Sequence, residues 1–334
     1  MLRQQFTTEY NPIEVKRIHG LIFTTIMETI LAIIGPTASG KSTLALSIAK
    51  KVDGEIIGLD SRQIYKDMPI GTAQPTEEDR KRIYHHLIGI REPTESVSAG
   101  EYAELVLEAI DTAKKRGKTP IICGGSGLYF RALSTGIFEG SMTNESIREK
   151  LEKDYDAHGS ELMLNRLKKI DPDYAEIVHP HNRKRLVRAL EIYESTGDPP
   201  SVHFKKQDAS ETRKIKTFTV LVLIPPDKLE NRIRNRTKTM LKSGWIDETK
   251  HLQEKYGVDN VHALDSIGYK QIIQVLDGEI TREVMEEEIV IRTRQYAKRQ
   301  RTWFRKENID LEINPDDYSN EKDIIETILV RMNK

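Results

Sequence analysis

A glycine-rich run near the start of the chain carries the clearest chemical meaning. It fits the pattern G-x-x-x-x-G-K-[ST], in which backbone N–H groups and the first turn of a helix bind phosphate oxygens. The lysine neutralises phosphate charge, and the last hydroxyl holds Mg²⁺. The predicted phosphate loop consists of Gly35, Pro36, Thr37, Ala38, Ser39, Gly40, Lys41 and Ser42. It predicts phosphate binding, but it does not separate a kinase or ATPase, which bind ATP, from a transferase that releases diphosphate.

An aspartate ends the next apolar run of the chain. Asp60 follows residues 55–59 and precedes Ser61, Arg62 and Gln63. Ligands of open parallel sheets bind beyond the carboxyl ends of the strands, so we expect Asp60 to face the phosphate loop. It could ligate Mg²⁺ through water, act as a general base on an acceptor, or cap a helix. Position alone leaves these three roles open.

A third apolar run, residues 119–123, ends in glycines instead of an acid. Many P-loop NTPases carry an acidic residue at this point, so Gly124 and Gly125 count against an ordinary ATPase. Glycines there also let another backbone or a substrate approach closely. Cys123 is the only cysteine, which excludes an intramolecular disulfide and argues against a cysteine zinc site. We expect it to be a buried strand residue.

Positive charge is concentrated in three stretches, although the formal net charge of the chain is zero. Such segregation is typical of proteins that bind a phosphate backbone, whereas any one stretch could equally be a solvated helix face. Aromatic residues in the last stretch could stack on unpaired RNA bases or belong to the core. The stretches contain Arg183, Lys184, Arg185 and Arg188; Arg232, Arg234, Arg236 and Lys238; and Arg292, Arg294, Lys298, Arg299, Arg301 and Arg305, with Tyr296, Trp303 and Phe304.

Apolar runs alternate with helical patterns around these residues. Strands are expected at 30–34, 55–59 and 119–123, and helices at 43–51 and 101–116. Buried strands that alternate with helices indicate a parallel sheet with helices on its faces. The sequence therefore predicts an α/β fold built on a P-loop parallel-sheet core.

The middle of the chain follows a different pattern. Residues 139–214 contain helical patterns only, at 147–156, 161–169 and 182–195, before a further strand at 218–224. We therefore expect a mostly helical inserted domain over 139–214. It would interrupt a P-loop core made of 27–138 and 215–334, the latter including the C-terminal helices.

The first 26 residues lack clear periodicity. We expect residues 1–26 to be a poorly ordered extension or a mis-assigned start, with an extra edge element as the alternative. The chain has 334 residues, 37% hydrophobic and 31% charged, which is ordinary for a globular protein. No segment approaches the ~20 apolar residues of a membrane span. We expect a cytoplasmic protein without membrane contact that acts as a monomer.

The chain resembles the tRNA dimethylallyltransferases, also called tRNA isopentenyltransferases, in a series of motifs that occur in the expected order. It resembles the compact bacterial form, because the C-terminal Cys/His zinc finger of eukaryotic members is missing. It departs from the common threonine at Ser42 and Ser126, but both keep a hydroxyl. The motifs are the phosphate loop and residues 60–66, 70–73, 124–129, 179–180, 182–183, 185, 188–191, 240–241, 244, 267–271 and 293–300.

The resemblance implies the reaction. Dimethylallyl diphosphate would donate its dimethylallyl group to the exocyclic N6 amine of the adenosine 3′ of the anticodon in a tRNA anticodon stem-loop, and diphosphate would leave. Asp60 would be the general base, and Lys41 with Arg232 or Arg236 would neutralise the diphosphate held by the phosphate loop. Mg²⁺ would bind at Ser42. Contacts with tRNA are expected at Asp60, Ser61, Arg62, Gln63, Ser126, Asn182, Arg183, Lys184, Arg185, Arg188, Ser266, Gly268, Tyr269, Lys270, Gln271, Arg294 and Lys298.

Three other functions are compatible with parts of the sequence. A P-loop nucleotide or small-molecule kinase could use 232–236 in a lid but would leave the last basic stretch unused. An RNA-binding NTPase would need an acidic strand end where this chain has glycines. An adenylate isopentenyltransferase would modify a free nucleotide and would not need the basic helices.

Overall fold

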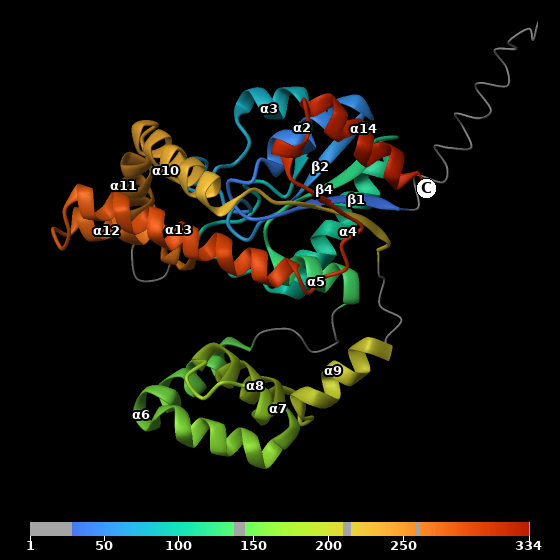
Figure 1. The fold of residues 1–334 in the computed structure, drawn as a ribbon. Helices are drawn as coiled ribbons and strands as arrows, with labels where there is room; N and C mark the ends of the chain where they lie inside the picture. Colours follow the sequence, from blue (N-terminus) through green and yellow to red (C-terminus); the bar gives the residue numbers. More distant parts are fainter. Residues whose placement is uncertain (1–28, 137–143, 210–214, 258–260, 334) are drawn as a thin grey trace, which may run out of the picture.

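The centre of the molecule is a sheet of six parallel strands in the order β3-β2-β4-β1-β5-β6. The computed structural model describes residues 29–136, 144–209, 215–257 and 261–333 (Figure 1). The predicted α/β fold with a parallel sheet is confirmed. The strands are β1 (Ile30–Ile34), β2 (Gly54–Leu59), β3 (His85–His86), β4 (Thr119–Gly124), β5 (Thr217–Val222) and β6 (Leu311–Ile313).

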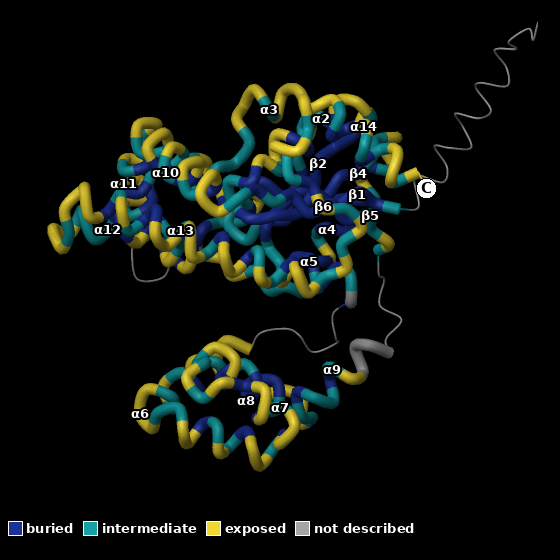
Figure 2. Tube along the Cα trace, viewed as in Figure 1, coloured by how far each residue is buried: buried dark blue, intermediate teal, exposed yellow. Residues whose placement is uncertain are grey.

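Both faces of the sheet are covered by helices. The even-numbered residues of β1 pack in a core with α4 (Ala99–Lys115) and α5 (Gly127–Thr135), and the odd-numbered residues pack with α2 (Lys41–Lys51) and α14 (Glu321–Met332). Figure 1 shows these two pairs on opposite faces, and Figure 2 shows the buried strands between them. Because neither face meets water, the strands are continuous apolar runs.

Four further helices form a group beside the sheet (Figure 1). Within it, α10 and α13 contact each other along their length through a small apolar cluster that includes Ile233, Val290 and Ala297. This group carries two of the three basic stretches. Its members are α10 (Pro226–Lys242), α11 (Trp245–Tyr256), α12 (Tyr269–Leu276) and α13 (Arg282–Phe304).

The helices between α5 and β5 form a separate unit with an apolar core of its own (Figure 1). Its longest helix is bent at Gly159, whose φ is +79°, which explains why the sequence shows two helical patterns there. Residues 137–143 and 210–214 lie outside the described residues, so the boundaries at 139 and 214 stay a prediction. The helices are α6 (Glu145–Ile170), α7 (Pro172–Ile177), α8 (Arg183–Thr196) and α9 (Pro200–Ala209).

Several short elements have no counterpart among those expected from the sequence. These include β3, of two residues, β6, of three, and α3 (Glu77–Arg82), of six, all too short for a periodic pattern to develop. The strand expected at 218–224 is β5 and ends at Val222, ahead of Pro225 and Pro226. The expected extension, residues 1–26, lies outside the described residues. None of the helices described is long and apolar enough to cross a membrane.

Candidate active site

A cavity of about 480 Å³ lies at the carboxyl ends of β1, β2 and β4. Parallel strands present these ends at one edge, so segments far apart in the sequence meet there. The phosphate loop and the segment after β2 lie on one side of the cavity, and α10 and α13 contribute the other. The lining residues include Thr37, Ala38, Lys41, Ser42, Asp60, Ser61, Arg62, Gln63, Cys123, Lys184, Arg236, Ser266, Tyr269, Tyr296, Arg299 and Gln300.

The phosphate loop joins β1 to α2. Gly40 precedes the helix in a left-handed conformation (φ +96°), and no side chain caps the first turn. The first N–H groups of α2 are therefore available to an anion, as phosphate loops require. The Lys41 ammonium donates a hydrogen bond to the Pro36 carbonyl over 3.1 Å. Desolvation lowers the pKa of Lys41, while Cys123 and the Asp60 carboxylate act in the opposite direction.

Two arginines of α10 contact this loop. Arg236 donates to the Thr37 hydroxyl over 3.3 Å, and Arg232 donates to the Ser39 carbonyl over 3.2 Å. Arg236 lines the cavity; burial lowers the pKa of its guanidinium, and Asp60 opposes the shift. Arg232 is exposed and contacts the loop from outside the cavity. The structure therefore brings both predicted arginines to the loop and only Arg236 into the cavity.

Asp60 both caps a turn and lines the cavity. Its Oδ1 accepts hydrogen bonds from the backbone N–H groups of Arg62, at 2.9 Å, and Gln63, at 3.4 Å. Its Oδ2 forms no hydrogen bond with any other residue that the structure describes. The Tyr102 hydroxyl accepts from the Asp60 N–H at 3.3 Å and donates to the Gly58 carbonyl at 2.9 Å. The capping role is thus met by one oxygen, which leaves the other for chemistry in the cavity.

The oxygen donors in the cavity suit Mg²⁺. The Ser42 hydroxyl and the Asp60 carboxylate both line it. Within the described residues, no group of three or more His, Cys, Asp or Glu side chains could hold a metal ion. Mg²⁺ usually binds one or two protein oxygens together with phosphate oxygens and water, so a small donor set beside a phosphate loop fits it.

The segment after Asp60 is held by side-chain bonds to a neighbouring loop. Gln63 Nε2 donates to the carbonyls of Thr72, at 3.2 Å, and Ala73, at 2.8 Å. Glu248 on α11 accepts from the backbone N–H groups of Ile70, at 2.7 Å, and Gly71, at 2.9 Å. The role of Glu248 cannot be inferred from the sequence, because its partners are nearly 180 residues away.

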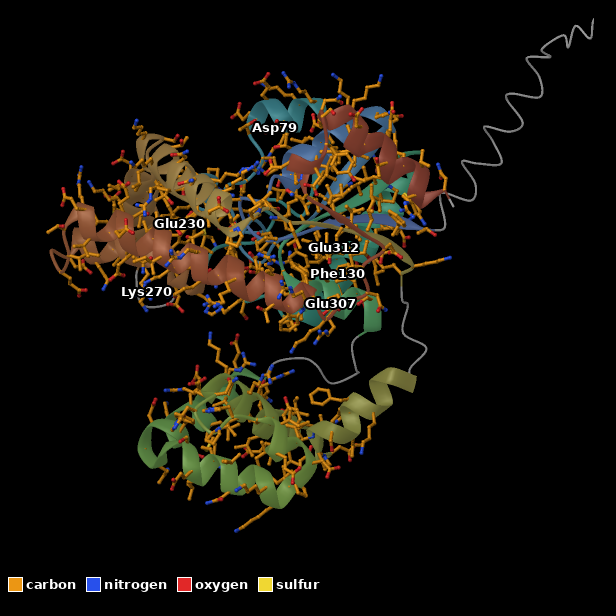
Figure 3. All side chains as sticks on the ribbon, viewed as in Figure 1. Asp79, Phe130, Glu230, Lys270, Glu307 and Glu312 are labelled. Carbon is orange, nitrogen blue, oxygen red and sulfur yellow. The ribbon has the colours of Figure 1, made fainter. Side chains whose placement is uncertain are left out.

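Of the predicted tRNA contacts at 266–271, two are used inside the protein. Tyr269 is fully buried and donates to Glu248 over 2.6 Å, and buried Gln271 accepts from the Gly268 N–H over 2.8 Å. These bonds hold α12 in place, and Tyr269 also lines the cavity; that the two residues contact tRNA stays a prediction. Ser266 lines the cavity, and Lys270, labelled in Figure 3, is exposed.

Some of the predicted tRNA-contacting residues at the start of α8 line cavities, and others bond within the helical unit. Lys184 lines the active-site cavity, whereas Arg185 and Arg188 line a second cavity of about 710 Å³, next to residues 96–100 of the core. Arg183 instead pairs with Asp156 of α6 at 2.9 Å and lies over the Tyr155 ring. The Asn182 side chain accepts from the Arg185 N–H at 3.2 Å and caps the helix.

The last basic stretch is partly neutralised by acids from other parts of the fold. Arg294 pairs with Glu230 of α10 at 2.7 Å, 64 residues away in the sequence; Glu230 is labelled in Figure 3. Lys298 is exposed and forms no ion pair with another described residue. Ser126 directly precedes α5. Its N–H donates to the Leu59 carbonyl over 3.2 Å, and it is not among the residues that line the active-site cavity.

The fold and this cavity define a P-loop α/β protein with an inserted helical unit. The IPP transferase family model matches residues 63–307. The tRNA dimethylallyltransferase of Acetivibrio thermocellus is 41% identical over 305 residues, which cover 90% of this chain and 96% of that protein. The chain therefore belongs to the IPP transferase family.

Two solved structures extend this comparison. The tRNA isopentenylpyrophosphate transferase of Staphylococcus epidermidis is 36% identical and aligns with a TM-score of 0.64 over 91% of this chain and 99% of its own. A eukaryotic dimethylallyltransferase, described as acting on tRNA, is 30% identical with a TM-score of 0.73, over 87% of this chain and 75% of its own.

Proposed function

We propose that this chain transfers a dimethylallyl group from dimethylallyl diphosphate to the N6 amine of the adenosine 3′ of the anticodon in tRNA. The allylic C–O bond breaks, a C–N6 bond forms, the amine gives up a proton and diphosphate leaves. One observation carries the proposal: a single cavity brings the phosphate loop together with an aspartate that has an uncommitted carboxylate oxygen. Membership of the IPP transferase family supports it.

The donor would bind on the phosphate loop. The first N–H groups of α2 and the Lys41 ammonium supply positive charge for the diphosphate, and Arg236 adds a second cation from the opposite wall. Hydrogen bonds to Pro36 and Thr37 orient Lys41 and Arg236, whose charges would stabilise the charge that develops on the leaving diphosphate. When bound at Ser42, Mg²⁺ would add further positive charge to the same oxygens.

The acceptor would approach from the Asp60 side. An exocyclic adenine amine is a weak nucleophile and must lose a proton as the new bond forms. Asp60 Oδ2 is the acceptor for that proton, while its Oδ1 keeps the carboxylate oriented through the Arg62 and Gln63 N–H groups. Holding the amine in line with the allylic carbon supplies the rest of the acceleration.

Exposed basic residues around the cavity suit a tRNA stem-loop. The target base must leave its stack, which costs a few kcal/mol and less in a loop than in a duplex. Exposed Lys184 lines the cavity from α8 and exposed Arg185 lines the neighbouring one, whereas Arg188 is half-buried and pairs with the buried Glu191 carboxylate at 2.9 Å. Phosphate contacts from Lys184, Arg185 and Lys298 would position the loop over the cavity.

A transfer assay tests the proposal. Radiolabelled dimethylallyl diphosphate is incubated with unmodified tRNA, with free adenosine monophosphate, or with neither, in each case with and without Mg²⁺. We expect Mg²⁺-dependent label in tRNA only. Label in the mononucleotide would favour an adenylate isopentenyltransferase. ATP turnover in a parallel incubation with ATP, without transfer of label, would favour the kinase.

A further inference from the structure

A buried glutamine joins the phosphate loop to α13. Gln300 is 6% exposed, and its Oε1 accepts a hydrogen bond from the Thr37 N–H at 2.9 Å. Its Nε2 donates to the carbonyl of Gly125, just after β4, at 2.8 Å. One side chain therefore connects three segments that come together only in the folded protein.

The contact is shaped for this side chain. A Cβ atom at Gly125 would lie 2.4 Å from Gln300 Nε2, so only glycine leaves room for the amide to reach the backbone. Both polar ends of the amide are satisfied, as a buried polar group requires. The glycine turn after β4, which the sequence marked as a place of close approach, is thus filled by a side chain of the protein.

Gln300 and Arg236 hold the same loop residue from two helices. Gln300 of α13 accepts from the Thr37 N–H, and Arg236 of α10 donates to the Thr37 hydroxyl. Helices α10 and α13 pack on each other, so the two contacts together restrict the position of Thr37 in the phosphate loop. Anion binding by such a loop depends on several N–H groups converging, and small displacements weaken all of them.

We propose that Gln300 is a positioning residue of the donor site, which fixes Thr37 and so keeps the phosphate loop in the shape that binds diphosphate. The inference deepens the proposed function and rests on it for the identity of the donor. A residue that only stabilised the fold would change the melting temperature and leave the affinity of the intact protein for diphosphate unaltered.

The test uses the full chain, inorganic diphosphate with Mg²⁺ as the probe, and isothermal titration calorimetry. Gln300→Met keeps the length and burial of the side chain and removes both hydrogen bonds. We expect about tenfold weaker diphosphate binding, the scale of one or two lost hydrogen bonds. In transfer assays, KM for dimethylallyl diphosphate should rise by about the same factor, while KM for tRNA stays within about twofold. Gln295→Met, an exposed substitution on the same helix, is the matched control.

A second variant guards against a folding failure. Gln300→Glu keeps an oxygen that can accept from Thr37 but cannot donate to Gly125, and its charge opposes diphosphate. We expect it to bind diphosphate at least as weakly as Gln300→Met. Unchanged diphosphate affinity in the folded variants would overturn the inference, as would an equal loss of tRNA binding. Because the probe is diphosphate itself, these outcomes are separate from a failure of wild-type transfer to tRNA.

Discussion

The Arg236 guanidinium donates a hydrogen bond to the Thr37 hydroxyl over 3.3 Å and so joins α10 to the phosphate loop. The sequence motif identifies the phosphate loop. It does not single out Arg236, which is one of several basic residues in the same stretch. Its neighbour on the same helix, Arg234, pairs with Glu287 at 2.6 Å. The two arginines therefore offer a direct comparison.

We predict that Arg236→Ala lowers the rate of transfer by about 10²-fold, the usual effect of removing one donor aimed at developing charge. Arg234→Ala, which removes a pair with an exposed carboxylate, should change the rate by less than about twofold. Single-turnover transfer with saturating tRNA measures both. Equal effects would mean that the charge of α10 acts as a whole and that Arg236 has no special position.

Lys41→Ala should weaken the donor interaction. The ammonium is the cation of the phosphate loop, and desolvation lowers its pKa although the Asp60 carboxylate opposes the shift. We expect donor binding at least tenfold weaker and tRNA affinity near normal, measured separately by titration. Unchanged kinetics with dimethylallyl diphosphate would remove the loop from the donor site.

Lys184 and Arg183 are adjacent but should behave differently. Lys184 is exposed and lines the cavity, so Lys184→Ala should weaken tRNA binding and reduce the log–log salt slope by about 0.7 to 0.9. Arg183 is tied to Asp156 and Tyr155, so Arg183→Ala should leave the slope unchanged. Binding titrations at several salt concentrations distinguish them. A lower slope in Arg183→Ala alone would reverse the assignment.

The thiol of Cys123 should be unreactive despite its place beside Lys41. Burial raises the pKa of Cys123 to about 11, and Lys41 and a hydrogen bond with Ser42 offset only part of that shift. At pH 8 about 0.1% of the thiol is ionised, since each pH unit below the pKa is a factor of ten. We expect iodoacetamide to leave the activity intact at pH 8 and to label faster as the pH rises toward 10. Rapid, stoichiometric labelling at pH 8 would contradict this.

The parts of the site that local patterns encode were predictable. The phosphate loop has a fixed spacing, and Asp60 follows directly from the end of a strand next to it, so both lie in the cavity as expected. The inserted helices also follow from the pattern of apolar residues, because the stretch shows helical spacing and no apolar run long enough for a central strand.

The contacts that cross the fold were not predictable. Gln300 lies 263 residues from Thr37, and Glu248 lies 177 residues from Gly71. Local sequence patterns do not reveal contacts between residues so far apart in the chain. The burial of Tyr269 and Gln271 was not predictable either. Both lie in a recognisable motif, but the packing of the folded chain decides whether their side chains are buried. The ion pair between Arg294 and Glu230 of another helix was not predictable for the same reason.

In the proposed reaction, the Asp60 carboxylate takes the proton from the adenine amine. Asp60→Asn is the sharpest test, because the amide oxygen can still accept from the Arg62 N–H and preserve the turn. The two roles predict different results. Loss of a metal ligand should raise the Mg²⁺ requirement and weaken binding of the donor, whereas loss of a general base should slow only the chemical step.

The most direct measurement is the single-turnover rate of dimethylallyl transfer to tRNA by Asp60→Asn, with donor and tRNA both saturating, over a range of Mg²⁺ concentrations. We predict a rate lower by about 10² to 10⁴, with donor affinity, tRNA affinity and Mg²⁺ dependence close to those of the unaltered chain. A normal rate, or a rate restored by high Mg²⁺, would contradict the assignment of Asp60 as the base.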